Sequence, residues 1–187
     1  KIEGEKSSNV HFAIDFLTGI QKRNLGNKNA QYINVEDKKV VVIGGGDTAM
    51  DCVRTSVREG ATSVKCLYRR DEANMPGSKK EVVNAKEEGV EFVFNVSPKS
   101  IKVENDLAVG VELLETSMSK SDTSGRQKVV LIEGSEYLED ADVIILALGF
   151  SPEVPSFLKE LNVETNSWGG IVVDSNFKTS NKKVYAG

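Results

Sequence analysis

VVVIGGGDTAMD, from Val40 to Asp51, is the stretch of sequence that decides the fold. Four apolar, β-branched residues are followed directly by three glycines, and a run compatible with a helix begins at Thr48. A buried strand, a tight glycine turn and a helix N-terminus form the first half of a dinucleotide-binding βαβ unit. The stretch therefore predicts an α/β domain with a nucleotide site at this turn.

The glycine pattern is G-x-G-x-x-A, with Gly44, Gly46 and Ala49 at its fixed positions and Gly45 between them. Glycines let the backbone turn sharply and approach a pyrophosphate, and the start of the helix offers N–H groups that no helical carbonyl satisfies. Many unrelated chains carry such a pattern by itself. Here the required strand precedes it and the required helix follows it, which favours a phosphate-binding turn.

Two residues follow the glycines in the first turn of the predicted helix. Asp47 complements the positive end of the helix dipole, an effect of about 0.3–1 kcal/mol, and we expect its carboxylate to point away from a bound phosphate. The hydroxyl of Thr48 has two possible roles, since it can donate to the pyrophosphate or cap the helix. Further along, Arg54 and Arg58 share one helical face, where they either attract an anionic cofactor or face solvent.

The next predicted strand, 63–68, ends at Arg69 and Arg70. In a dinucleotide-binding unit this position lies beside the adenosine ribose, where an acidic residue favours NAD. Two arginines instead offer planar, permanently charged donors to a 2′-phosphate, which favours NADP. The alternative is a solvated charge cluster, because Asp71 and Glu72 follow immediately.

The apolar run 141–148 predicts a further strand of the central sheet, ending at Ala147, Leu148 and Gly149. A glycine there lets a ligand pass close to the backbone, or it simply ends the strand before Pro152.

The remaining elements are a helix over 10–23 capped by Ser8 or Asn9, a helix from 78 to 88 opened by a Ser78/Glu81 capping box, and a strand 90–96 closed by Pro98. Short alternating runs at 101–103, 107–115 and 129–133 predict an antiparallel β-meander, with a loop at 117–126.

Composition excludes several classes of function. The chain has 187 residues, 28% of them charged, with a net charge of −4, which gives no reason to expect nucleic acid or an anionic membrane as a partner. No apolar run approaches the ~20 residues needed to span a bilayer. Cys52 and Cys66 form no C-x-x-C motif, so we expect two buried thiols in a reducing compartment, and His11 is the only histidine. No residue is an evident acid, base or nucleophile.

Three stretches carry a resemblance to a known family: VVVIGGGDTAMDCVRTSVREGA (40–61), CLYRRDEANMPGSKKEVVNAKEEGVEFVFN (66–95) and ADVIILALGFSPE (141–153). They resemble the small (β) subunits of NADPH-dependent glutamate synthase, within the flavoproteins that have two dinucleotide-binding domains. The resemblance implies a three-layer FAD/NAD(P)-binding, Rossmann-like domain, with a central parallel sheet and the antiparallel meander.

By the same resemblance, 1–35 is a crossover from an FAD domain, 36–150 is the NADPH-binding domain, and 151–187 is a partial return segment of a longer protein. Gly44–Ala49 then match the pyrophosphate turn, Arg69 and Arg70 the 2′-phosphate site, and Ala147–Gly149 a segment near the cofactor. The implied activity is transfer of a hydride from NADPH to FAD, and of electrons through iron–sulfur clusters outside this chain to a glutamate synthase large subunit or another acceptor chain, in the cytoplasm. In such chemistry the cofactors react and the protein positions them.

Three alternatives stay open at this point. A stand-alone NADP-dependent dehydrogenase needs a proton donor, for which the sequence has no Tyr-x-x-x-Lys motif. A methyltransferase also begins with a glycine turn, but expects an acid where Arg69 stands. A ligand-free interaction domain would leave the triple glycine as an unexplained entropic cost.

Overall fold

The computed structural model describes residues 1–119 and 127–187, which fall into two units, Lys1–Leu148 and Gly149–Gly187. Most of the predicted loop at 117–126 lies outside the described residues. Within the described ranges, no helix is both long enough and apolar enough to cross a membrane.

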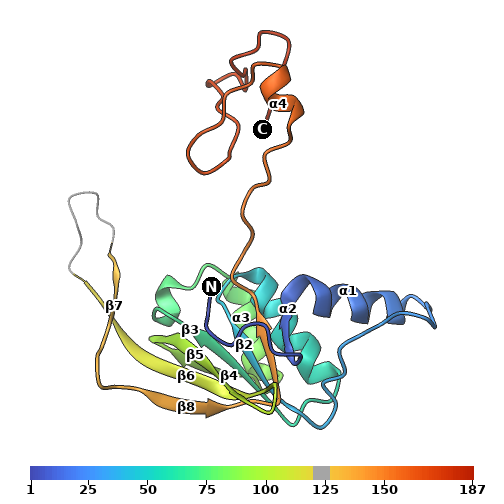
Figure 1. Ribbon diagram of the computed structural model, residues 1–187, viewed down its shortest axis with the longest axis vertical. Helices are drawn as coiled ribbons and strands as arrows, with labels where there is room; N and C mark the ends of the chain where they lie inside the picture. The colour runs from blue at the N-terminus through green and yellow to red at the C-terminus, as the bar shows by residue number, and fades with distance from the viewer. Residues whose placement is uncertain (120–126) are drawn as a thin grey trace. The chain divides into compact units, whose positions relative to one another are not determined.

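A parallel sheet of five strands organises the first unit (Figure 1). Its order is β1-β9-β2-β3-β4, so the strand before the glycine turn, β2, is central. Each strand is parallel to its neighbours, and Val42 lies opposite both Cys66 and Ile145. The strands are β1 (Val10–Phe12), β2 (Lys39–Ile43), β3 (Ser63–Tyr68), β4 (Glu91–Phe94) and β9 (Val143–Leu146).

Three helices cover one face of this sheet: α1 (Ala13–Asn24), α2 (Asp47–Arg58) and α3 (Lys79–Glu87) (Figure 1). Since side chains alternate along a strand, Val40 and Val42 pack toward the helices while Val41 and Ile43 pack toward the opposite face. All four are buried. Burial on both faces explains why β2 is a continuous apolar run rather than an alternating one.

Antiparallel strands form the layer on the opposite face. The long strand β6 (Leu107–Met118) pairs with β5 (Val96–Glu104), β7 (Val129–Leu131) and β8 (Tyr137–Asp140). Val111 and Leu113 of β6 pack in one cluster with Ile43, Leu67 and Ile144 of the parallel sheet. The predicted three-layer α/β architecture with a meander is confirmed, although β8 was not predicted.

The predicted helix over 10–23 is wrong at its beginning, because its first three residues form β1 and the helix starts at Ala13. Asn9 explains the difference. Its side-chain amide donates to the carbonyls of Ala108 and Asp142, and its side-chain oxygen accepts from the N–H of Ala108, each at 2.8 Å. Asn9 is thus held beside β9 and does not cap the helix; the N-cap residue is Phe12.

Two other local predictions are corrected. Ser78 is the N-cap residue of α3, but no side-chain capping bond forms, and the Glu81 carboxylate pairs with Arg54 instead of closing a capping box. The predicted strand 90–96 is divided at Asn95, whose φ is 56°, and Pro98 lies inside β5 rather than ending a strand.

The second unit contains a short helix, α4 (Phe157–Glu160). It also has two isolated β-bridges, Thr165 with Ile171 and Lys178 with Tyr185. Side-chain bonds hold the unit together, including the donation from Asn181 Nδ2 to the Leu161 carbonyl at 2.6 Å.

Candidate dinucleotide-binding site

The glycine turn lies at the carboxyl edge of the parallel sheet, between the ends of β9 and β3. The N–H of Gly44 donates to the Leu67 carbonyl at 3.1 Å, and the N–H of Ala147 donates to the Ile43 carbonyl at 2.9 Å. Gly44 has φ of 150°, and a Cβ added there would lie 2.3 Å from the Ala147 carbonyl oxygen. Only glycine therefore allows β2 to turn so close to β9.

The next two glycines have different surroundings. A Cβ on Gly45 would lie 2.4 Å from the ring of Tyr68, so packing explains this glycine. A Cβ on Gly46 would meet nothing within 4 Å, and the φ of Gly46 is −90°. Neither packing nor backbone conformation explains glycine at this position. The space left open there fits the close approach of a phosphate to the backbone.

Gly46 is also the N-cap residue of α2, and no side chain caps the helix. In the described part of the chain, the N–H groups of Asp47 and Thr48 donate to no protein acceptor, as expected for the first turn of a helix. The capping role considered for Thr48 is therefore wrong. The free N–H groups and the helix dipole make the open side of the turn attractive to an anion.

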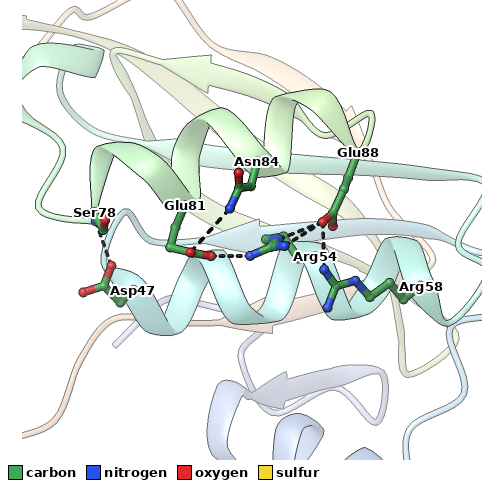
Figure 2. Close-up of polar contacts among 7 residues, drawn as sticks. All are labelled: Asp47, Arg54, Arg58, Ser78, Glu81, Asn84 and Glu88. Carbon is green, nitrogen blue, oxygen red and sulfur yellow. Dashed lines mark hydrogen bonds and ion pairs between the residues drawn. The ribbon is translucent and has the colours of Figure 1, made fainter.

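Asp47 turns its carboxylate toward the start of α3, where its Oδ1 accepts the N–H of Ser78 at 2.7 Å (Figure 2). Beside it, the N–H of Gly77 donates to the carbonyl of Gly45 at 2.9 Å. The segment 75–78 is thus fastened to the glycine turn at two points. Sequence reasoning missed this contact, although the Pro76-Gly77 pair is a turn signal that points to it.

Arg69 and Arg70 follow β3 at the same sheet edge. Their backbone is held by β6 and by Asn95, the residue that links β4 to β5: the Thr116 hydroxyl donates to the Arg69 carbonyl at 3.0 Å, and the Asn95 N–H donates to the Arg70 carbonyl at 3.1 Å. The side chain of Arg70 reaches only the carbonyl of Gln127, at 3.5 Å, and its buried Nε has no partner in the described structure.

Neither arginine forms an ion pair with any described residue, whereas Arg23, Arg54 and Arg58 each pair with a glutamate. The acids that follow them in sequence have other partners. Asp71 accepts the backbone and side-chain N–H groups of Asn74, and Glu72 pairs with Lys86 at 2.6 Å. Among the described residues, the two guanidinium groups thus have no anionic partner, and a 2′-phosphate is an anion of suitable chemistry.

Arg54 and Arg58 face α3 rather than a cofactor (Figure 2). Arg54 pairs with Glu81 and, at 2.7 Å, with Glu88, which also pairs with Arg58 at 2.7 Å. The hydrogen bonds that the Glu88 carboxylate accepts, first from Arg54 and then from Arg58, hold its pKa below its usual range. Simple exposure to solvent is therefore wrong for Arg54, whose side chain is 19% exposed, but agrees with the 61% exposed side chain of Arg58.

The strand end at 147–149 is divided between the two units. Ala147 is buried against the glycine turn, and Leu148 is 61% exposed at the end of the first unit. Gly149 has φ of 86° and belongs to the second unit, so the site built from the first unit ends at Leu148.

The thiol of Cys66 lies directly under the turn and donates to the Gly44 carbonyl at 3.3 Å. Burial raises the pKa of Cys66 and of Cys52 to about 12, so both thiols stay protonated and are poor nucleophiles. Among the described residues, no group of three or more histidine, cysteine, aspartate or glutamate side chains could hold a metal ion.

Relatives with known names resemble the chain over its whole length. It is 46% identical to the glutamate synthase [NADPH] small chain of Escherichia coli K12 and 43% identical to the putative oxidoreductase AegA of the same organism, and both alignments cover 100% of the chain. The small chain of Azospirillum brasilense is 45% identical over 97% of the chain. The chain spans 41%, 29% and 38% of the length of these relatives.

A solved structure supports the fold. Thioredoxin reductase from T. acidophilum superposes with a TM-score of 0.68 at 21% identity, covering 98% of this chain and 51% of that one. A family model described as pyridine nucleotide-disulphide oxidoreductase matches residues 1–187. The chain therefore belongs to the pyridine nucleotide-disulphide oxidoreductase family.

Proposed function

We propose that this chain is the NADPH-binding part of a flavin-dependent oxidoreductase. The observation that carries the proposal is the pair of arginines after β3. Arg69 and Arg70 have no acidic partner in the described residues, and they follow the strand that ends beside the open glycine turn. Two permanent charges with no counter-ion among the described residues, next to a turn suited to a phosphate, favour a dinucleotide with an additional phosphate.

The residues of the chain have distinct tasks in this proposal. The turn Gly44–Gly46 and the free N–H groups of Asp47 and Thr48 bind the pyrophosphate, with Ala49 packed beneath. Arg69 and Arg70 bind the 2′-phosphate. The strand end Ala147–Gly149 lies near the cofactor. When bound, NADPH supplies a hydride to FAD, and this chain contributes position and charge rather than an acid or base.

For the whole protein we propose the role named in its relatives, the small chain of an NADPH-dependent glutamate synthase. FAD and iron–sulfur clusters then belong to parts of the longer protein outside this chain. A large subunit receives the electrons and makes glutamate from glutamine and 2-oxoglutarate. Identity of 42–47% to several small chains supports this role, as does a match over 97–100% of the chain. We place the protein in the cytoplasm, with residues 36–150 as the NADPH-binding domain.

A second candidate differs only in the electron acceptor. The putative oxidoreductases AegA and UacF are 43% and 44% identical to the chain, which is nearly as similar as the small chains are. A related iron–sulfur flavoprotein reductase with another acceptor would need the same NADPH-binding part. A stand-alone dehydrogenase has less support, because the edge described above offers neither a histidine nor a Tyr-x-x-x-Lys pair as proton donor for a carbonyl substrate.

Anaerobic addition of NADPH to the full-length protein tests the proposal. Flavin absorbance should fall on mixing with NADPH, and NADH at the same concentration should act far more slowly. Adding a glutamate synthase large subunit with glutamine and 2-oxoglutarate should then restore the oxidised flavin and yield glutamate. A full-length protein without flavin, or a flavin that NADPH cannot reduce, contradicts the proposal. Reduction by NADPH with no transfer to the large subunit leaves the second candidate.

A further inference from the structure

Two polar side chains are buried in the described residues, Ser56 and Thr116. The hydroxyl of Ser56 donates to the Cys52 carbonyl at 2.8 Å, one turn earlier in its own helix α2. The hydroxyl of Thr116 donates from β6 to the Arg69 carbonyl at 3.0 Å, across 47 residues of sequence. The first bond is local and the second joins two layers of the fold.

Packing alone does not require a hydroxyl at position 116. Thr116 lies near the end of β6, where valine has the same branched shape and an equal preference for strands. A buried hydroxyl is costly unless it is hydrogen-bonded, so its presence calls for a reason. In the structure its single bond to a distant residue holds the carbonyl of Arg69.

Neighbouring bonds extend this support to the second arginine. The N–H of Thr116 donates to the Asn95 carbonyl at 2.7 Å, and the N–H of Asn95 donates to the Arg70 carbonyl at 3.1 Å. The ladder between β3 and β4 ends at Tyr68 and Phe94, so it does not include the arginines. Thr116 of β6 and Asn95, which links β4 to β5, therefore fix the backbone from which both guanidinium groups extend.

We propose that Thr116 is a positioning residue that sets the preference for a 2′-phosphorylated dinucleotide. The inference rests on the proposed function. The Arg69 side chain is exposed and has no ion pair among the described residues, so its direction depends on the backbone that carries it. Removing the hydroxyl leaves the Arg69 carbonyl without its hydrogen-bond donor. The backbone at Arg69 can then move so that this carbonyl binds water. The glycine turn has its own bonds to β3 and β9, so pyrophosphate binding stays intact.

Thr116→Val in the 187-residue chain tests the inference. Dissociation constants for NADPH and NADH are measured by titration, with 2′,5′-ADP and 5′-ADP as probes that lack the nicotinamide. Loss of one neutral hydrogen bond should weaken NADPH and 2′,5′-ADP roughly threefold to tenfold. Binding of NADH and 5′-ADP should not change. Thr116→Ser, which keeps the hydroxyl, should restore most of the preference for NADPH.

Ser56→Ala is the matched control, because it also removes a buried hydroxyl bonded to a carbonyl, and it should leave the ratio of the NADPH and NADH constants unchanged. If Thr116→Val does not fold, Thr116→Ala removes the same hydroxyl and carries the same expectation. An unchanged ratio in a folded variant, or an equal loss for both dinucleotides, overturns the inference while the proposed function stands. Equal binding of NADPH and NADH by the unsubstituted chain overturns both.

Discussion

Two pairs of arginines lie in adjacent parts of the α/β unit and have opposite electrostatic surroundings. Arg54 and Arg58 on α2 form ion pairs with Glu81 of α3 and with Glu88, its C-cap residue, and so join the two helices. Arg69 and Arg70 after β3 have no acidic partner in the described residues, and only their backbone is firmly held. The first pair stabilises the fold, whereas the second pair, in our proposal, binds an anionic ligand.

The difference depends on where the nearby acids point. Glu81 and Glu88 are seven residues apart, two helical turns, so one face of α3 presents both carboxylates to α2. Asp71 and Glu72 are next to the second pair in sequence, yet they bind Asn74 and Lys86. Nearness in sequence therefore says little about which charges neutralise each other.

The largest effect is expected from Arg69→Ala combined with Arg70→Ala. Each change removes a charged hydrogen bond to the 2′-phosphate, worth about 1–3 kcal/mol of NADPH binding. NADH binding should not change, and the melting temperature should change little because neither side chain forms an ion pair with a described residue. Titration with both dinucleotides measures the first two, and thermal unfolding the third. An equal loss of NADH binding would place the arginines outside a 2′-phosphate site.

Gly46→Ala should weaken both dinucleotides, on the order of tenfold, because its methyl group would occupy the space proposed for the pyrophosphate. The free protein should keep its melting temperature, since the added Cβ meets nothing within 4 Å. Gly45→Ala is the contrasting variant, because its Cβ would lie 2.4 Å from the Tyr68 ring and should destabilise the fold. Full binding by Gly46→Ala would contradict the assignment of the turn.

Arg54→Met should lower the melting temperature, by roughly a few degrees for a chain of this size. It leaves the carboxylates of Glu81 and Glu88 without their main partner while keeping the side-chain volume. The ratio of NADPH to NADH affinity should stay the same. Arg58→Met, at a position where the side chain is 61% exposed, should have a smaller effect on stability. A change in dinucleotide preference caused by Arg54→Met would remove the distinction between the two arginine pairs.

The smallest expected effect is on the stability of the fold at acidic pH. Arg54 and Arg58 hold the pKa of Glu88 below its usual range, so the pairing contributes stability that is fully present above the unfolded-state pKa of about 4.3. That stability is lost as the pH falls toward the lower pKa of the folded state. The difference in melting temperature between the parent chain and Glu88→Gln should therefore narrow below about pH 4.3. Glu87→Gln, at an exposed neighbouring carboxylate, is the control; a Glu88→Gln difference that stays constant with pH would contradict the role of the pair.

Local signals predicted the central βαβ unit well. A continuous apolar run, a triple glycine and a helix start are all contained within Val40–Arg58, so β2, the turn and α2 follow from short-range chemistry. The arrangement of β3 and β9 on either side of β2 agrees with the apolar runs at 63–68 and 141–148. The edge that holds Gly44, Arg69 and Ala147 could thus be predicted from strand ends alone.

Hydrogen bonds and ion pairs between residues far apart in the sequence account for the features that sequence reasoning did not predict. The Asn9 side chain donates to the carbonyls of Ala108 and Asp142 and so holds the start of β1 in the sheet. Val10–Phe12 are therefore a strand despite their helical pattern of apolar residues. Glu81 forms an ion pair with Arg54 instead of the expected capping bond, and the Thr116 hydroxyl donates to the Arg69 carbonyl from a different layer. Each partner lies between 27 and 133 residues away, where periodicity carries no information.

The central claim is that the guanidinium groups of Arg69 and Arg70 bind the 2′-phosphate of NADPH. Titration of the 187-residue chain with NADPH and NADH under the same salt conditions tests it most directly. We expect NADPH to bind more tightly by roughly tenfold or more, with the difference shrinking as salt screens the phosphate. Equal affinity, or tighter binding of NADH, would contradict the account.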